Sequence, residues 1–207
     1  MSVQGTDEWF AERVGQITAS RIKDVMAKTK TGYSTSRKNY ATELALERIT
    51  GQKAERYSNS AMAWGTEQEP FARAEYERFT GELVDEIGYV AHNVVRHSGA
   101  SPDGLVGSHG ILEIKCPNTA THIEWAVAGK VPPEHVMQMQ WQIECTGRDW
   151  ADFVSFDPRM PDGQQLFIRR LHRDHKIISE ITAEIISFDR DIDEIIKSLD
   201  SVDWINK

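Results

Sequence analysis

The chain has 207 residues, 40% hydrophobic and 27% charged, which is the composition of an ordinary globular domain, and no apolar run reaches the roughly 20 residues of a membrane helix. Two cysteines, Cys116 and Cys145, are too few for a disulfide framework or a four-cysteine metal site, and no signal or transit peptide is visible, so we expect one cytoplasmic domain over residues 1–207. The net charge of −8 argues against a broadly basic DNA-binding surface, so any DNA must meet a confined basic groove or be bound mainly at its end.

The first eighty residues predict helices joined by short polar loops. Capping residues, glycine stops and apolar residues at three- and four-residue steps mark these helices. We expect helices over residues 7–13, from 18 or 20 to 28, over 37–50 and over 66–80, with a polar loop over 29–34.

The rest of the chain predicts strands interspersed with helices. Expected strands cover residues 83–90, 94–97, a hairpin over 103–115, then 150–156 and 166–171. Helices are expected over 121–128 and from Pro132-Pro133 onward, and isoleucines at helical spacing from Ile177 to Ile195 indicate an amphipathic helix packed on the core. Helices that flank a central group of strands predict one α/β or α+β domain.

Charge is unevenly distributed along the chain. Many acidic residues lie in the last third, whereas basic residues are denser early, at Lys23, Lys28, Lys30, Arg37 and Lys38. This asymmetry permits a local basic face without requiring one.

The segment from Asp103 to Lys115 combines a turn with closely spaced charged residues. Residues 107–110 are turn-prone and would fold the chain into a hairpin that brings Asp103 beside Glu113. In a strand, Glu113 and Lys115 share one face while Ile114 points into the core. Two crowded carboxylates need a cation, and hard oxygen ligands suit Mg²⁺ or Mn²⁺. The alternatives are an ordinary Pro-Asp-Gly turn and a solvated strand face.

Further segments accompany this hairpin in a fixed order. They are Trp9 with residues 13–20, Ala63-Trp64-Gly65 with Glu69, residues 101–105, residues 112–117, Gln138-Met139-Gln140 and residues 156–160. Together they resemble the lambda exonuclease family of phage recombination nucleases, within the PD-(D/E)XK superfamily. The resemblance implies a nuclease core of the α/β class, with a central mixed β-sheet flanked by helices.

The resemblance also implies an activity. A family member would be a magnesium-dependent 5′→3′ exonuclease on linear double-stranded DNA that prefers 5′-phosphorylated ends, releases mononucleotides and leaves 3′ single-stranded DNA. It would form a ring-shaped homotrimer around the DNA, work with a single-strand annealing protein, and be encoded by a phage or prophage.

The family roles transfer to residues that match its motifs. Asp103 and Glu113 would bind Mg²⁺ together with the main-chain carbonyl of Ile114, Glu69 would add an acid at a site for two ions, and Lys115 would orient the attacking water. A pocket for the 5′-phosphate would consist of four further residues, which are Arg13, Ser20, Ser101 and Gln140.

Several of these residues have simpler interpretations. Thr66 and Glu69 have the spacing of a capping box, with Pro70 in the first helical turn. Gln140 fits a polar helix face, and Arg13 fits an exposed helix position. At the level of function, the alternatives are an endonuclease of restriction or repair type and a non-catalytic module that binds DNA ends or a partner.

Overall fold

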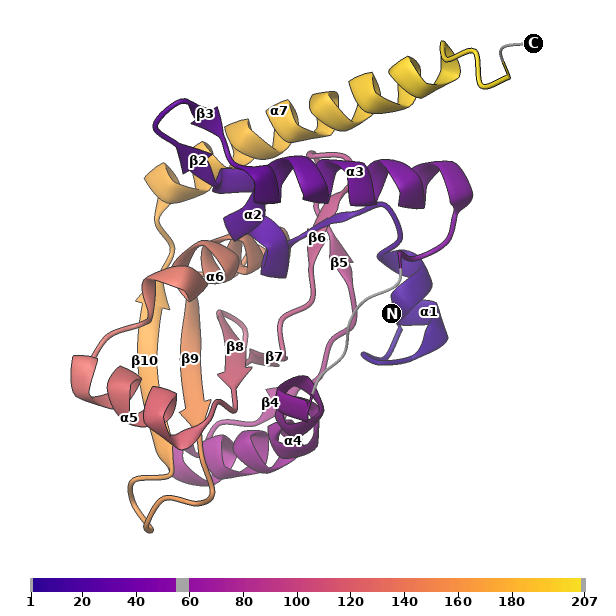
Figure 1. Ribbon diagram of the computed structural model, residues 1–207. Helices are drawn as coiled ribbons and strands as arrows, with labels where there is room; N and C mark the ends of the chain where they lie inside the picture. Colours follow the sequence, from indigo (N-terminus) through magenta and orange to yellow (C-terminus); the bar gives the residue numbers. More distant parts are fainter. Residues whose placement is uncertain (1, 55–59, 206–207) are drawn as a thin grey trace.

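A mixed five-stranded sheet lies at the centre of the computed structural model, which describes residues 2–54 and 60–205 (Figure 1). Its strand order is β10-β9-β8-β7-β4, and only the β8–β9 pair is parallel. The strands are β4 (Val84–Asp85), β7 (Gly104–Val106), β8 (Gly110–Lys115), β9 (Trp150–Phe156) and β10 (Leu166–His172).

Helices cover both faces of this sheet. On one face, Tyr76 of α4 (Ser60–Thr80) packs against Leu112 and Ile114 of β8. On the other face lie α5 (Thr119–Ala128) and α6 (Pro133–Thr146), where Met139 packs against Ile111. Alternate residues of β8 therefore enter two different cores, as the period of a strand requires.

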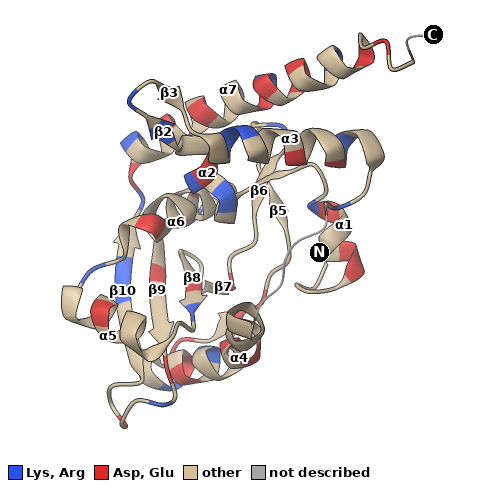
Figure 2. Ribbon diagram, viewed as in Figure 1, with Lys and Arg blue, Asp and Glu red and all other residues tan. Residues whose placement is uncertain are grey.

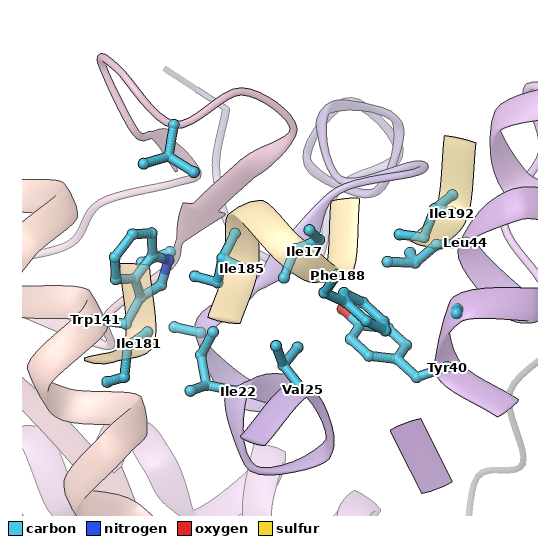
Figure 3. Close-up of a cluster of buried hydrophobic side chains, with 14 of the residues drawn as sticks. Ile17, Ile22, Val25, Tyr40, Leu44, Trp141, Ile181, Ile185, Phe188 and Ile192 are labelled. Carbon is cyan, nitrogen blue, oxygen red and sulfur yellow. The ribbon is translucent and has the colours of Figure 1, made fainter. Parts of the chain in front are cut away.

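A helical layer stands beyond α6. It contains η1 (Ala19–Arg21), α2 (Ile22–Met26), α3 (Thr35–Thr50) and α7 (His175–Asp200), and it includes a small sheet of order β1-β6-β5. Figure 3 shows Phe188 of α7 beside Tyr40 of α3 and Ile192 near Leu44, while Ile181 and Ile185 lie toward Trp141 of α6. The amphipathic C-terminal helix is thus confirmed as a core element. The small strands are β1 (Ile17–Thr18), β5 (Val90–Ala91) and β6 (Ser98–Ala100).

The predicted α/β class, with a central mixed sheet between helices, is confirmed. The hairpin, the strand over 150–156 and the helix that starts at Pro133 also lie where they were expected. No helix in the described part of the chain is both long and apolar enough to span a bilayer.

Three local predictions were wrong. The expected loop over 29–34 contains half of a short hairpin, β2 (Lys28–Thr29) with β3 (Gly32–Tyr33). Only the ends of the strand expected over 83–90 are paired, and 94–97 is a turn in which His97 has a φ of 52°. β2 and β3 pair with each other across a short turn, whereas β1 and β4 exist because they pair with the more distant β6 and β7, which no local pattern could show. The one remaining element, α1 (Asp7–Glu12), is capped by Thr6 as expected.

Among the early basic residues, Arg37 is buried, whereas Lys23, Lys28, Lys30 and Lys38 are exposed. Figure 2 shows acidic residues along α7, beside the basic residues of α2 and α3. Arg37 pairs with Glu184 at 3.3 Å and Asp191 at 2.9 Å, and Arg48 pairs with Asp189 at 2.8 Å. Part of the early positive charge is therefore neutralised inside the helical layer, while the exposed lysines still permit a local basic face.

Candidate active site

The β7–β8 hairpin brings Asp103 beside Glu113. The Asp103 amide donates to the Leu112 carbonyl at 3.0 Å, and the Asp103 carboxylate Oδ2 accepts from the Ile114 amide at 2.6 Å. Gly104 has no room for a side chain, because a Cβ there would lie 2.1 Å from a methyl carbon of Val84. Gly104 therefore serves the close packing of β7 on β4, while the turn of the hairpin lies at residues 107–109.

Glu113 is held from two directions and is only 1% exposed. Its Oε1 accepts from the Lys115 ammonium and from Gln138 Nε2 at 2.5 Å, and its Oε2 accepts from Gln142 Nε2. Glu113 and Lys115 share the α6 face, while Ile114 points into the core on the α4 side. Two amide donors and one cation thus orient a buried carboxylate.

The charges at the hairpin strongly perturb one another. Burial, together with the neighbouring Glu113 carboxylate, raises the pKa of Asp103 well above its ordinary value. Burial alone would lower the pKa of Lys115, but Glu113 and Asp103 outweigh it and hold that pKa above its ordinary value. Lys115 is therefore a cation here, suited to donating hydrogen bonds rather than to accepting a proton.

Glu69 approaches the hairpin from α4. It lines a cleft of about 420 Å³ together with Asp103, Ile114 and Lys115. Burial raises the pKa of Glu69, although Arg73, with Nη2 at 2.8 Å, acts in the opposite direction. Arg73 also donates to the Asp103 carbonyl at 3.4 Å, so it ties α4 to the hairpin. No sequence pattern had identified Arg73.

The capping-box interpretation of Glu69 was wrong. Thr66 lies inside α4, and its hydroxyl donates to the Met62 carbonyl at 3.2 Å. Pro70 is likewise an interior helix residue. The helix starts earlier than the capping signal suggested, which leaves Glu69 free of the helix end.

A second concavity, of about 190 Å³, adjoins the acids. Arg13, Ser20 and Ser101 line it together with Asp103 and Lys115. The Trp9 indole donates to the Ser101 hydroxyl at 3.0 Å, and the Arg13 guanidinium carbon lies 3.9 Å from the centre of the Trp9 ring. Three of the four residues expected to bind phosphate are thus gathered next to the expected metal ligands.

Gln140, the fourth, does not reach this concavity. It is fully buried on the opposite side of α6, where Nε2 donates to the His172 carbonyl at 2.8 Å and Oε1 accepts from the Asp174 amide at 2.9 Å. Gln138 and Gln142 line the concavity instead. Residues four apart share a helix face while residues two apart do not, and this spacing was the signal that could have selected Gln138.

The donor set fits a hard divalent cation. Asp103 and Ile114 line the larger cleft, and Asp103 and Glu113 line the smaller one. Two carboxylates and a carbonyl are the oxygen ligands that Mg²⁺ and Mn²⁺ prefer. Within the described residues, no group of three or more His, Cys, Asp or Glu side chains is arranged to hold a metal. Any ion would therefore depend on main-chain and water oxygens besides the two acids.

Comparisons with known proteins agree with this geometry. Residues 8–149 match the YqaJ-like viral recombinase domain. The crystal structure of an alkaline exonuclease, LHK-Exo, from Laribacter hongkongensis has 50% sequence identity and a TM-score of 0.87, over 94% of this chain and 96% of that one. Its complex with dAMP has 51% identity and a TM-score of 0.88 over the same shares.

A phage-related exonuclease from Haemophilus somnus shares the fold, with a TM-score of 0.71 at 17% identity over 89% of this chain and 96% of that one. A search of curated proteins gave no significant match. A divalent metal is typical of nucleases of this kind, and the resemblance to lambda exonuclease is confirmed. The chain therefore belongs to the YqaJ-like viral recombinase family and is an enzyme of the exodeoxyribonuclease type.

Proposed function

We propose that this protein is a magnesium-dependent 5′→3′ exonuclease on linear double-stranded DNA that prefers 5′-phosphorylated ends. The observation that carries the proposal is the junction of two concavities. Asp103 and Lys115 line both the pocket of Arg13, Ser20 and Ser101 and the cleft of Glu69. A terminal 5′-phosphate bound in the pocket of Arg13 would place the next phosphodiester of the strand beside Asp103 and Glu113.

The phosphate pocket supplies end recognition. Arg13 is a bidentate donor suited to a phosphate, and the hydroxyls of Ser20 and Ser101 add neutral donors. Because Trp9 stacks on Arg13 and bonds Ser101, both are held in place before the DNA arrives. Gln138 replaces Gln140 as the glutamine of this pocket.

The hairpin supplies the hydrolysis. Asp103, Glu113 and the Ile114 carbonyl would hold Mg²⁺, and Glu69 would be a further acid for a second ion; the bound metal would supply Lewis-acid activation of water and charge neutralisation at the phosphate. Lys115, kept charged by the acids, orients the attacking water and donates to the phosphate. Each cut releases a mononucleotide and leaves a new 5′-phosphate for the pocket.

The cellular setting follows from the family. We propose that the whole chain, residues 1–207, acts as one nuclease domain in a homotrimeric ring in the cytoplasm of a bacterial host. A ring would retain an acidic subunit on DNA without a large basic surface. The 3′ single strand would pass to a single-strand annealing protein during phage recombination. Light scattering tests the ring, because a monomer in solution would contradict it.

The decisive experiment uses end-labelled duplexes with a 5′-phosphate or a 5′-hydroxyl, each with and without Mg²⁺. We expect rapid release of 5′-mononucleotides only from phosphorylated ends with Mg²⁺, and loss of the end preference in Arg13→Ala. Mn²⁺ is expected to substitute. Equal rates on both ends would contradict the pocket, and cleavage of covalently closed circles would indicate an endonuclease. Absence of metal binding in calorimetry would indicate a DNA-end-binding module.

A further inference from the structure

A third concavity continues the cleft beyond the acids, on the side away from the phosphate pocket. It has a volume of about 350 Å³ and shares Ala61, Cys116 and Pro117 with the cleft that contains Glu69. The three hollows therefore form one connected path, in which the acids stand between the pocket of Arg13 and this third hollow. No role in phosphate or metal binding falls on its residues.

Trp64 of α4 and Arg159, after β9, form a wall of the third hollow. The Arg159 guanidinium carbon lies 4.8 Å from the centre of the Trp64 ring. Arg159 is fixed from behind, since Nε donates to Asp157 Oδ1 at 2.7 Å and Nη2 donates to the Pro117 carbonyl at 3.1 Å. Its side chain is nevertheless 47% exposed. A flat group is thus held rigidly with half of its surface open.

The electrostatics of this wall favour a base over a phosphate. The Asp157 carboxylate that holds Arg159 is buried, and hydrogen bonds from Arg159 and Thr119 outweigh burial and lower its pKa to about 2. It stays ionised at neutral pH and compensates the charge of Arg159. A compensated guanidinium beside an indole attracts the face of an aromatic ring more than it attracts a free anion.

The Trp64 indole adds a second observation. Its Nε1 atom is buried and has no hydrogen-bond partner among the described residues. Buried polar atoms without partners are costly, and those that persist call for an explanation such as a functional role. Phe or Leu would fill such a position without that cost, so packing alone gives no reason for an indole here.

We propose that Trp64 and Arg159 form a stacking subsite for a nucleobase of the digested strand, on the 3′ side of the scissile phosphate. The inference rests on the proposed function, because the direction of the path follows from a 5′-phosphate held near Arg13. A volume of about 350 Å³ is within the usual range for small-ligand pockets. The subsite would hold the strand in line between successive cuts, and it would accept any base, since every base has a flat face.

The test is a scan of 5′-phosphorylated duplexes in which one abasic residue stands at successive positions of the digested strand. In the wild type, the single-turnover rate of the first cut should fall on the order of ten-fold when the abasic residue reaches the subsite. Trp64→Ala should cut intact DNA more slowly by a similar factor, and its rate should no longer depend on the position of the abasic residue. Trp64→Phe should keep that dependence. A parallel scan with methylphosphonate linkages tests for a phosphate contact.

Each outcome of these scans either supports or contradicts the base subsite. If Trp64→Ala keeps the wild-type abasic profile, or if only the methylphosphonate scan depends on Trp64, the base subsite is wrong. If Trp64→Ala unfolds, as judged by its thermal midpoint, Trp64→Leu replaces it and should lose the abasic penalty that Trp64→Phe keeps. If the wild type digests DNA at the same rate wherever the abasic residue stands, this inference alone is wrong. If the wild type does not digest phosphorylated ends at all, the proposed function is wrong.

Discussion

The molecule buries charge in two regions, and it does so in opposite ways. In the helical layer, Arg37 is 2% exposed and faces the acids Glu184 and Asp191. At the β7–β8 hairpin, Asp103, Glu113 and Glu69 crowd around Lys115, and burial together with the neighbouring carboxylates raises the pKa of Asp103 and that of Glu69. The first arrangement stabilises the fold, whereas the second sets three acids against the cations Lys115 and Arg73 and is poised for a further cation. Matched charge indicates structure, and unmatched charge indicates function.

The largest expected effect is that of Asp103→Asn, which tests whether the crowded acids of the hairpin serve function rather than stability. We expect exonuclease activity to fall on the order of a thousand-fold or more, because a metal ligand is lost. The thermal midpoint of the metal-free protein should stay the same or rise, since the change relieves repulsion between acids while an oxygen remains for the Ile114 amide. Nuclease assays and thermal denaturation check both parts. A large loss of stability would mean that the acids are structural.

The opposite behaviour is expected of Arg37→Ala. Removal of this buried cation should cost about 3–5 kcal/mol of unfolding free energy, because it removes the partner of Asp191 and one of the partners of Glu184, which keeps Lys28. Turnover per folded molecule should be unchanged. Urea unfolding measures the loss, and Arg37→Lys serves as the control that retains charge. If the variant is fully folded but turns over more slowly, residues of the helical layer also contribute to activity.

A matched pair on α6 sharpens the comparison further. Gln138→Ala should lower activity about 10- to 100-fold with little loss of stability, because Gln138 orients Glu113. Gln140→Ala should lower stability by about 1–3 kcal/mol with little loss of activity, because both ends of its amide are bonded in the core. If the two results were exchanged, the assignment of these glutamines would be reversed.

The smallest expected effect concerns pH. The pKa of Asp157 is lowered to about 2 in the folded protein, so its ionised carboxylate stabilises the fold at pH values above about 4. This contribution is lost as the pH falls from about 4 toward 2. Asp157→Asn should therefore cost about 2 kcal/mol at neutral pH and converge with the wild type near pH 2.

Asp103 provides the control with the opposite sign. Its pKa is raised on folding, so its ionisation opposes folding as pH rises, and Asp103→Asn should gain relative stability toward neutral pH. Urea titrations of the metal-free protein between pH 2 and 7 compare the two variants. Parallel curves for both would show that the two carboxyls have the same environment.

The sequence by itself determined the hairpin, β9, the start of α6 and the apolar face of α7. These features follow from local sterics and from the periods of strands and helices, which neighbouring residues encode. The same alternation placed Glu113 and Lys115 on one face. The resemblance to known nucleases added Glu69, Arg13, Ser20 and Ser101, which line the two hollows that Asp103 and Lys115 share.

Only the tertiary structure decided which glutamine meets Glu113, which acids of α7 neutralise the early basic residues, and that Trp64 lies against Arg159. These contacts join residues far apart in the chain, and they depend on how helices rotate and strands pair when the cores close. A local pattern restricts each residue to a face, but packing selects what that face meets. For that reason the sequence suggested a polar helix face for Gln140, but it could not show that Gln140 is buried in the core.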